Sequence, residues 1–291
     1  MMHRCAAFLC LLHLSATAVH AEDSREGCPK PEVTSADKSR YTLFRPTPVA
    51  LLREMSTDRP DTTESPVTVD AGHFQIESSL VDYSRERSRG VTRETWCVGP
   101  TNLKVGLLDR TDLQLILEPY TVSKTGGVSG KREGVSDLAV RLKQNLWGNE
   151  GDRGSAFALM PWVSAPTGGD DLSAGRYEGG LIAPLSVAVT EGVSASVMLE
   201  ADALWDEVRQ KYFVAWTHTA ACGFDVTEKL GMYVEYVGVT DSGGASPYRS
   251  SANVGLTYAF SANLVADGGI RVGLNSRADD LGVFTGVSYR H

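Results

Sequence analysis

From Gly72 to the end of the chain, apolar and polar side chains alternate with a period of two residues. This is the pattern of a β-strand whose two faces meet different surroundings. The clearest run, residues 192–206, places Val193, Val197 and Leu199 on one face and Glu200 and Asp202 on the other. Such a run exceeds the length of about 3–10 residues that is usual for strands of globular proteins. The pattern therefore predicts long strands with one apolar and one polar face.

About twelve segments show this alternation, and an even number of antiparallel strands can close into a barrel with both termini on one side. The predicted fold is all-β: a transmembrane antiparallel β-barrel of about twelve strands, with a short N-terminal periplasmic segment. The predicted strands lie near 72–84, 91–107, 111–121, 135–147, 154–166, 177–190, 192–206, 210–225, 228–241, 249–260, 262–275 and 281–290.

A membrane barrel is compatible with the mean hydropathy of −0.15, because only the outward face of each strand must be apolar. Outer-membrane barrels have short periplasmic turns and longer external loops. The even-numbered connections here are short, whereas three odd-numbered ones, at 123–134, 167–178 and 240–248, are longer and rich in glycine. The alternative is a secreted β-sandwich or soluble barrel with its apolar face inward. Strand length and the loop pattern favour the membrane barrel.

The first 21 residues have a basic start, an apolar run from Cys5 to Leu14 and a small-residue exit ending at Ala21. This arrangement is typical of a secretory signal peptide, and we expect cleavage after Ala21. The apolar run is shorter than the roughly 20 residues that a membrane helix needs. We therefore predict a signal peptide at 1–21, a periplasmic arm at 22–66 and a barrel at 67–291, located in the outer membrane of a Gram-negative-type envelope.

Charged residues recur on the polar faces of the predicted strands, where the lumen of a barrel would be. Positive side chains fall on the second and fourth strands and negative ones on the seventh and ninth, which predicts opposed walls of opposite charge. Replacing Arg141 and Lys143 with Gln is expected to shift ion selectivity toward cations without preventing assembly. The candidate selectivity residues are Lys104, Glu118, Arg141, Lys143, Glu200, Asp202, Glu235, Asp267 and Arg271.

Residues 56–66, which directly precede the first strand, combine charge with two prolines that stiffen the chain. Their charges could pair with lumenal cations such as Lys104 or Arg141. We hypothesise that this stretch is a small plug or latch at or inside the periplasmic mouth; the alternative is a solvated periplasmic linker. The candidate plug residues are Asp58, Arg59, Pro60, Asp61 and Glu64.

Several stretches resemble a bacterial outer-membrane family, the transporter-like family of the meta-pathway of phenol degradation. The resemblance rests on TDRPD at 57–61, TESP at 63–66, GHFQIE at 72–77, PTNLKVG at 100–106 and DLQL at 112–115. It implies a porin-like barrel that passes small, aromatic or hydrophobic solutes. The terminal Tyr289-Arg290-His291 departs from the C-terminal aromatic residue that many outer-membrane barrels carry.

Other functions have less support in the sequence. Without a CxxC pair or a Cys/His cluster we expect no metal and no cofactor, and a net charge of −8 disfavours nucleic acid. An esterase or lipase would need a base such as His218, which has no nearby serine and no GxSxG motif. A closed structural or adhesion barrel remains an alternative to the channel. The expected partners are membrane lipid, the barrel-assembly machinery and a small solute, and the oligomeric state stays open.

Aromatic residues fall mostly near the ends of the predicted strands, as in the girdles that mark the two membrane interfaces. They are Tyr83, Trp96, Tyr120, Trp147, Trp162, Trp205, Tyr212, Tyr258 and Tyr289.

Overall fold

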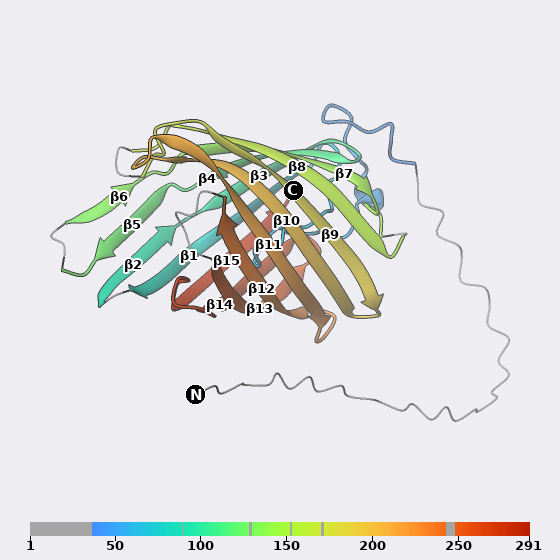
Figure 1. The fold of residues 1–291 in the computed structure, drawn as a ribbon. Helices are drawn as coiled ribbons and strands as arrows, with labels where there is room; N and C mark the ends of the chain where they lie inside the picture. Colours follow the sequence, from blue (N-terminus) through green and yellow to red (C-terminus); the bar gives the residue numbers. More distant parts are fainter. Residues whose placement is uncertain (1–36, 89, 128–129, 152, 170–171, 243–247) are drawn as a thin grey trace, which may run out of the picture. The chain divides into compact units, whose positions relative to one another are not determined.

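A computed structural model of the chain describes residues 37–88, 90–127, 130–151, 153–169, 172–242 and 248–291. These residues belong to one compact unit, Ser35–His291. The predicted signal peptide and the first part of the predicted arm lie outside the described residues. The described unit is an antiparallel β-barrel (Figure 1).

One sheet closes on itself because β1 pairs with β15 as well as with its neighbours in sequence. In the described part of the chain, no helix is long and apolar enough to cross a membrane. The strands are β1 (Phe74–Ser88), β2 (Val91–Val98), β3 (Thr101–Leu108), β4 (Thr111–Leu117), β5 (Tyr120–Thr125), β6 (Lys131–Gly134), β7 (Leu138–Trp147), β8 (Ser155–Ala165), β9 (Glu178–Thr190), β10 (Val193–Asp206), β11 (Lys211–Asp225), β12 (Leu230–Asp241), β13 (Arg249–Ser261), β14 (Leu264–Gly273) and β15 (Leu281–Arg290).

The prediction of a twelve-stranded closed barrel is confirmed: β1, β3, β4 and β7 to β15 form the closed ring, and β2, β5 and β6 are additional strands. Two of the predicted strands are broken, at Gly99-Pro100 between β2 and β3 and at Glu118-Pro119 between β4 and β5, whereas β6 lies in a predicted loop. Proline cannot donate a ladder hydrogen bond, which accounts for both breaks. The first half of β1 therefore pairs with β3 and its second half with β2. Strands β2, β5 and β6 lie together at one end of the barrel (Figure 1).

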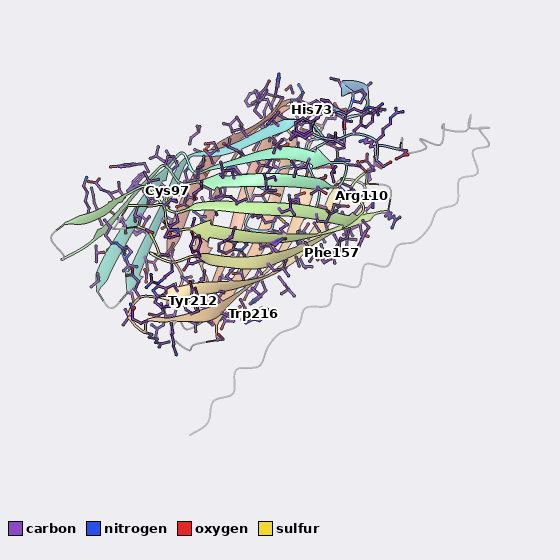
Figure 2. All side chains as sticks on the ribbon, turned by 90° about the horizontal axis from the view of Figure 1, so that it is seen from above. His73, Cys97, Arg110, Phe157, Tyr212 and Trp216 are labelled. Carbon is purple, nitrogen blue, oxygen red and sulfur yellow. The ribbon has the colours of Figure 1, made fainter. Side chains whose placement is uncertain are left out.

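The connections differ partly from the expected pattern. At the end that holds Phe74 and Arg290, all connections are short: 109–110, 148–154, 191–192, 226–229 and 262–263. This is the periplasmic end by the rule for outer-membrane barrels. At the other end, 166–177 is long, but β5 and β6 extend into the predicted loop at 123–134 and leave only 126–130 between them. Figure 2 shows His73 and Arg110 toward the periplasmic end and Cys97 and Tyr212 toward the external end.

The two faces of the wall differ as a membrane barrel requires. Outward side chains such as Leu199, Trp216 and Leu256 are exposed and apolar. Inward side chains are polar and buried, including Gln75, Glu77, Lys104, Asp112, Gln114, Lys143 and Asn253. Trp96, Tyr120, Tyr212, Tyr258 and Tyr289 are exposed, as expected of interfacial aromatics.

Trp162 is not a girdle residue. It packs against the buried Met160, Ile182 and Met198, and its indole nitrogen donates to Asp202 at 3.0 Å. Trp162 does lie near the end of β8, as the sequence predicted. Alternation along β8 nevertheless places its side chain on the inward face with Met160, whereas a girdle residue faces outward.

Residues 37–71 precede β1 and contact the periplasmic end and the lumen of the barrel. A short 3-10 helix, Val49–Leu51, lies within them. Gly106 on β3 lets this chain approach the wall closely, because a Cβ at this position would lie 2.0 Å from the carbonyl oxygen of Asp70. Ala71 forms an isolated parallel bridge with the same glycine. The N-terminal segment is thus seated directly on the backbone of β3.

We expect Gly106→Ala to lower the free energy of unfolding by about 1–3 kcal/mol, because the added methyl group must displace the backbone of Asp70. Urea unfolding of the protein refolded into lipid vesicles measures this loss. Gly169→Ala is the matched control, since a Cβ at Gly169 meets no atom within 4 Å. Equal stability of the two variants would contradict the close approach at Gly106.

Candidate functional site

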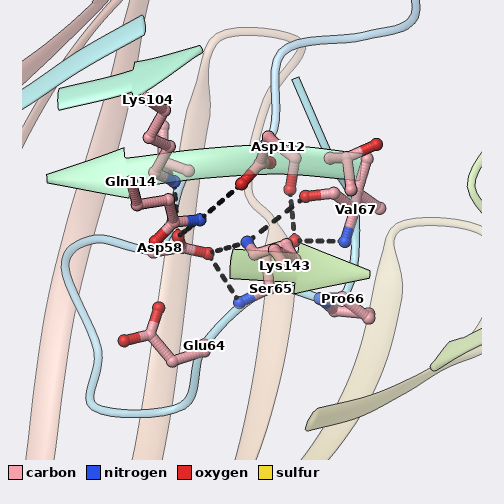
Figure 3. A network of polar contacts seen from close by, with 12 residues as sticks. Asp58, Glu64, Ser65, Pro66, Val67, Lys104, Asp112, Gln114 and Lys143 are labelled. Atoms are coloured by element: carbon pink, nitrogen blue, oxygen red, sulfur yellow. Dashed lines mark hydrogen bonds and ion pairs between the residues drawn. The ribbon is translucent and has the colours of Figure 1, made fainter. Parts of the chain in front are cut away.

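Residues 56–66, here called the lumenal segment, contact inward side chains from strands all around the barrel. The strands contacted are β1, β3, β4, β7, β10, β11, β12, β13 and β14. Only a segment inside the barrel can reach strands on all of these sides. Figure 3 shows the part of this segment that faces β3, β4 and β7.

Asp58 is the centre of the polar contacts in Figure 3. Its Oδ1 accepts a hydrogen bond from the Lys143 amine at 2.6 Å. Its Oδ2 lies 2.5 Å from the amine of Lys104. Lys104 also pairs with Glu77, whose carboxylate accepts the backbone N–H of Asp58 at 3.0 Å. The two lysine side chains are 2% and 0% exposed, so Asp58 neutralises cations that the wall has removed from water.

The pKa of Asp58 reflects two opposed effects. Burial by itself raises the pKa of a carboxyl group, but Lys104, Lys143 and Arg141 outweigh it. Together these cations hold the pKa of Asp58 far below its ordinary value. Asp58 is therefore charged over the whole physiological range.

Two further ion pairs tie the lumenal segment to different walls. Glu64 accepts from Arg141 on β7 at 2.5 and 3.2 Å. Arg59 donates to both oxygens of Asp267 on β14, at 2.7 and 3.1 Å. A two-pronged guanidinium–carboxylate contact fixes orientation as well as distance. The segment is consequently held in one orientation across the lumen.

Glu235 on β12 binds the segment through backbone groups. It accepts the N–H groups of Thr62 and Thr63, at 3.0 and 2.7 Å, and the hydroxyl of Thr63 at 2.6 Å. Asn253 donates to the same carboxylate at 2.6 Å. A carboxylate that accepts several donors needs no cation nearby. Glu235 is thus part of the docking site rather than an open lumenal charge.

A second set of contacts joins residues 37–55, here called the mouth segment, to the periplasmic turns. Arg53 lies 2.7 Å from Asp109 in the β3–β4 turn and 2.5 Å from Glu150 in the β7–β8 turn. Its backbone N–H donates to the buried Asp70 at 3.0 Å, and its carbonyl accepts from Arg290 at 2.8 Å. This cluster was not predicted from the sequence, because its members are far apart in the chain. The only signal for it in the sequence was the presence of charged residues, Asp109 and Glu150, in short turns.

The remaining candidate residues do not all face the segment. Glu118 lies in the break between β4 and β5, where it accepts from the Ser136 hydroxyl at 2.8 Å. Arg271 pairs with Asp82 and stacks over Phe284, 5.2 Å from the ring centroid. Glu200 and Asp202 lie on β10, beside the apolar group of Met160, Ile182 and Met198.

Asp61 is the segment's carboxyl group without an ion pair among the described residues. Burial raises the pKa of Asp61 well above its ordinary value, and the nearby carboxylates of Glu235, Glu64 and Asp58 raise it further. Docking therefore favours the neutral form. The stabilisation from this group is complete below the ordinary Asp pKa and is lost as pH rises through the raised value.

We accordingly expect the lumenal segment to dock less tightly at alkaline pH. Single-channel recordings from about pH 5 to about pH 9 should show mean conductance rising with pH, and Asp61→Asn should remove most of this response. Glu54→Gln is the control, because Glu54 is exposed in the mouth segment. A pH response of the Asp61→Asn variant equal to that of the wild type would contradict this assignment.

A closed barrel with an apolar outward face, a polar lumen and part of its own chain docked inside defines a transmembrane β-barrel of the outer-membrane class. The chain belongs to the family described as "Putative MetA-pathway of phenol degradation", whose profile matches residues 57–291. The match begins within the lumenal segment. No curated protein matches the sequence.

One solved structure shares the fold, and others are similar to a lesser degree. An outer-membrane channel from Pseudomonas putida F1 superimposes with a TM-score of 0.65 at 15% identity, covering 81% of this chain and 100% of that chain. The NanC porin gives 0.46 at 8% identity over 74% and 98% of the two chains. The CymD monoaromatic hydrocarbon channel gives 0.40 at 8% identity over 75% and 87%.

Proposed function

We propose that this protein is an outer-membrane channel for small aromatic or hydrophobic solutes, and that the lumenal segment is its plug. The observation that carries the proposal is the docking of residues 56–66 inside a barrel whose hydrogen-bonded ladder is complete without them. A segment that is not part of the wall can leave without opening it. Its departure would clear the space that it now fills.

The lumen offers an apolar surface for such solutes beside its polar walls. Met160, Ile182 and Met198 are buried on the inward faces of β8, β9 and β10, with Trp162 packed against them. The backbone N–H of Glu64 donates to the sulfur of Met198 at 3.4 Å, so the docked segment reaches this surface. Thioether and indole groups make favourable contacts with aromatic rings. The family description, which refers to phenol degradation, supports the same solute class.

An enzymatic role has weaker support. His218 shares the outward face of β11 with the exposed Trp216, and its Nε2 lies 3.2 Å from the hydroxyl of Tyr248. Among the described residues, no serine is hydrogen-bonded to this histidine, so a nucleophile for ester hydrolysis is not in place. Ester hydrolysis that His218→Ala abolishes would favour the enzyme instead.

Recordings from the purified protein in planar bilayers test the proposal. We expect rare, small openings of the wild-type channel and uptake of phenol into liposomes that contain it. If the protein is a closed structural barrel, the wild type will not conduct ions. The variant with a replaced lumenal segment will not conduct ions either. Absence of conductance in both proteins would therefore overturn the proposed function.

A further inference from the structure

A cavity of about 460 Å³ lies at the external end of the lumen, away from the docked segment. It is bounded by the inward faces of β12, β13 and β14, the ends of β1 and β2, and the β14–β15 connection. Its volume is in the range of small-molecule sites, about 300–1,000 Å³. We call it the arginine pocket after the residues that line it, Arg93, Arg249, Arg271 and Arg277.

The charge of this pocket is opposite to that of the protein. The four arginines face only two lining carboxylates, Glu86 and Asp279, whereas the whole chain has a net charge of −8. Arg271 is neutralised by Asp82, and Arg93 lies 3.7 Å from Glu86. Among the described residues, no carboxylate lies within ion-pair distance of Arg249 or Arg277.

The pocket also has an apolar wall. Val237, which is 8% exposed, and Val239 are among its lining residues. A guanidinium group binds a carboxylate through two parallel hydrogen bonds, and the planar fork loses little freedom on doing so. The valines and the arginines together suit a ligand with a small apolar body and one carboxylate.

We propose that the arginine pocket is a binding site for small organic carboxylates, with Arg249 and Arg277 as the binding cations. Arg271, which pairs with Asp82 and stacks over Phe284, is a further lining residue. Glu86 and Asp279 limit the excess positive charge, so that a monoanion is preferred to a dianion. The site goes beyond the proposed channel function, since binding at this end requires no movement of the lumenal segment.

Binding of benzoate to the purified protein in detergent, followed by ligand-observed NMR, tests the site. We expect Arg249→Gln with Arg277→Gln to weaken benzoate binding by about tenfold or more. The matched control is Arg110→Gln with Lys229→Gln, which removes two exposed cations at the periplasmic end and should leave benzoate affinity unchanged. Equal benzoate affinity of the double variant and the wild type would overturn the proposal.

Measurements on the wild type give an independent test if the double variant fails to fold. Benzoate affinity should fall several-fold between about 50 mM and about 500 mM salt, because salt screens exposed charges. Benzamide, which has no charge, should bind more weakly and without this salt dependence. Binding of benzamide as tight as that of benzoate, or binding of sulfate as tight as that of benzoate, would overturn the assignment to carboxylates. These assays need no conducting channel, so a failure of the proposed function leaves their outcome unaffected.

Discussion

Replacing residues 56–66 with a Gly/Ser linker of equal length is expected to raise the single-channel conductance several-fold. The replacement removes the contacts of Asp58 with Lys104 and Lys143, and those of Thr62 and Thr63 with Glu235. It retains the chain length, so the mouth segment stays connected to β1. Without specific contacts a Gly/Ser chain behaves as a flexible coil and no longer spans the lumen in one conformation.

Planar-bilayer recordings measure this change, and heat-modifiable gel migration verifies that the barrel still folds. Glu54→Gln provides a control within the same N-terminal region, because Glu54 is exposed and outside the lumenal segment. If the linker protein conducts like the wild type, the segment is a solvated part of the lumen and not a plug. A replacement is preferable to a deletion, because a deletion would also pull Arg53 away from Asp109 and Glu150.

Asp58→Asn is expected to be the most damaging single substitution in the lumenal segment. It leaves the fully buried Lys143 without its ion-pair partner at 2.6 Å, and Lys104 keeps only Glu77. Breaking a buried pair on one side costs about 3–5 kcal/mol, because an uncompensated charge remains out of water. The loss should be seen either as a lower free energy of unfolding or as a larger open fraction, if undocking of the segment lets water reach Lys143.

Urea unfolding in lipid vesicles and single-channel recording together detect both outcomes. The low pKa of Asp58 adds a pH test: its stabilisation is present above the ordinary Asp pKa of about 3.9 and is lost only as pH falls through the lower value of the folded protein. Wild-type docking should therefore persist at about pH 4. An Asp58→Asn variant with unchanged stability and unchanged conductance would show that the Lys104 and Lys143 pairs do not hold the segment.

The structure changes the expected result of replacing Arg141 and Lys143 with Gln. From the sequence these residues were expected to act as lumenal charges that set ion selectivity. In the fold each of them instead binds a carboxylate of the lumenal segment, Glu64 or Asp58. The double substitution should therefore loosen the segment and raise conductance in addition to any shift toward cations. That shift in selectivity stays a prediction.

The wall of the barrel was largely determined by the sequence alone, because each strand must present one face to lipid and one to the lumen. This requirement produces the period-two pattern that located all twelve strands. The breaks within two of them were signalled by Gly99-Pro100 and Pro119 but not predicted. Their effect depends on neighbouring strands, since a missing ladder donor matters only where a partner strand would have accepted it.

The contents of the lumen were decided by the tertiary structure. A period of two shows which residues share a face, but it does not show which strands stand opposite each other or what lies between them. Barrel closure brings Asp267 to Arg59 across 208 positions of sequence and Glu235 to Thr62 across 173. Closure also makes the lumen narrow enough for one segment to meet both walls. Charges that alternation marks as open to water thus become buried ion pairs, because burial is a property of the closed barrel and not of a strand.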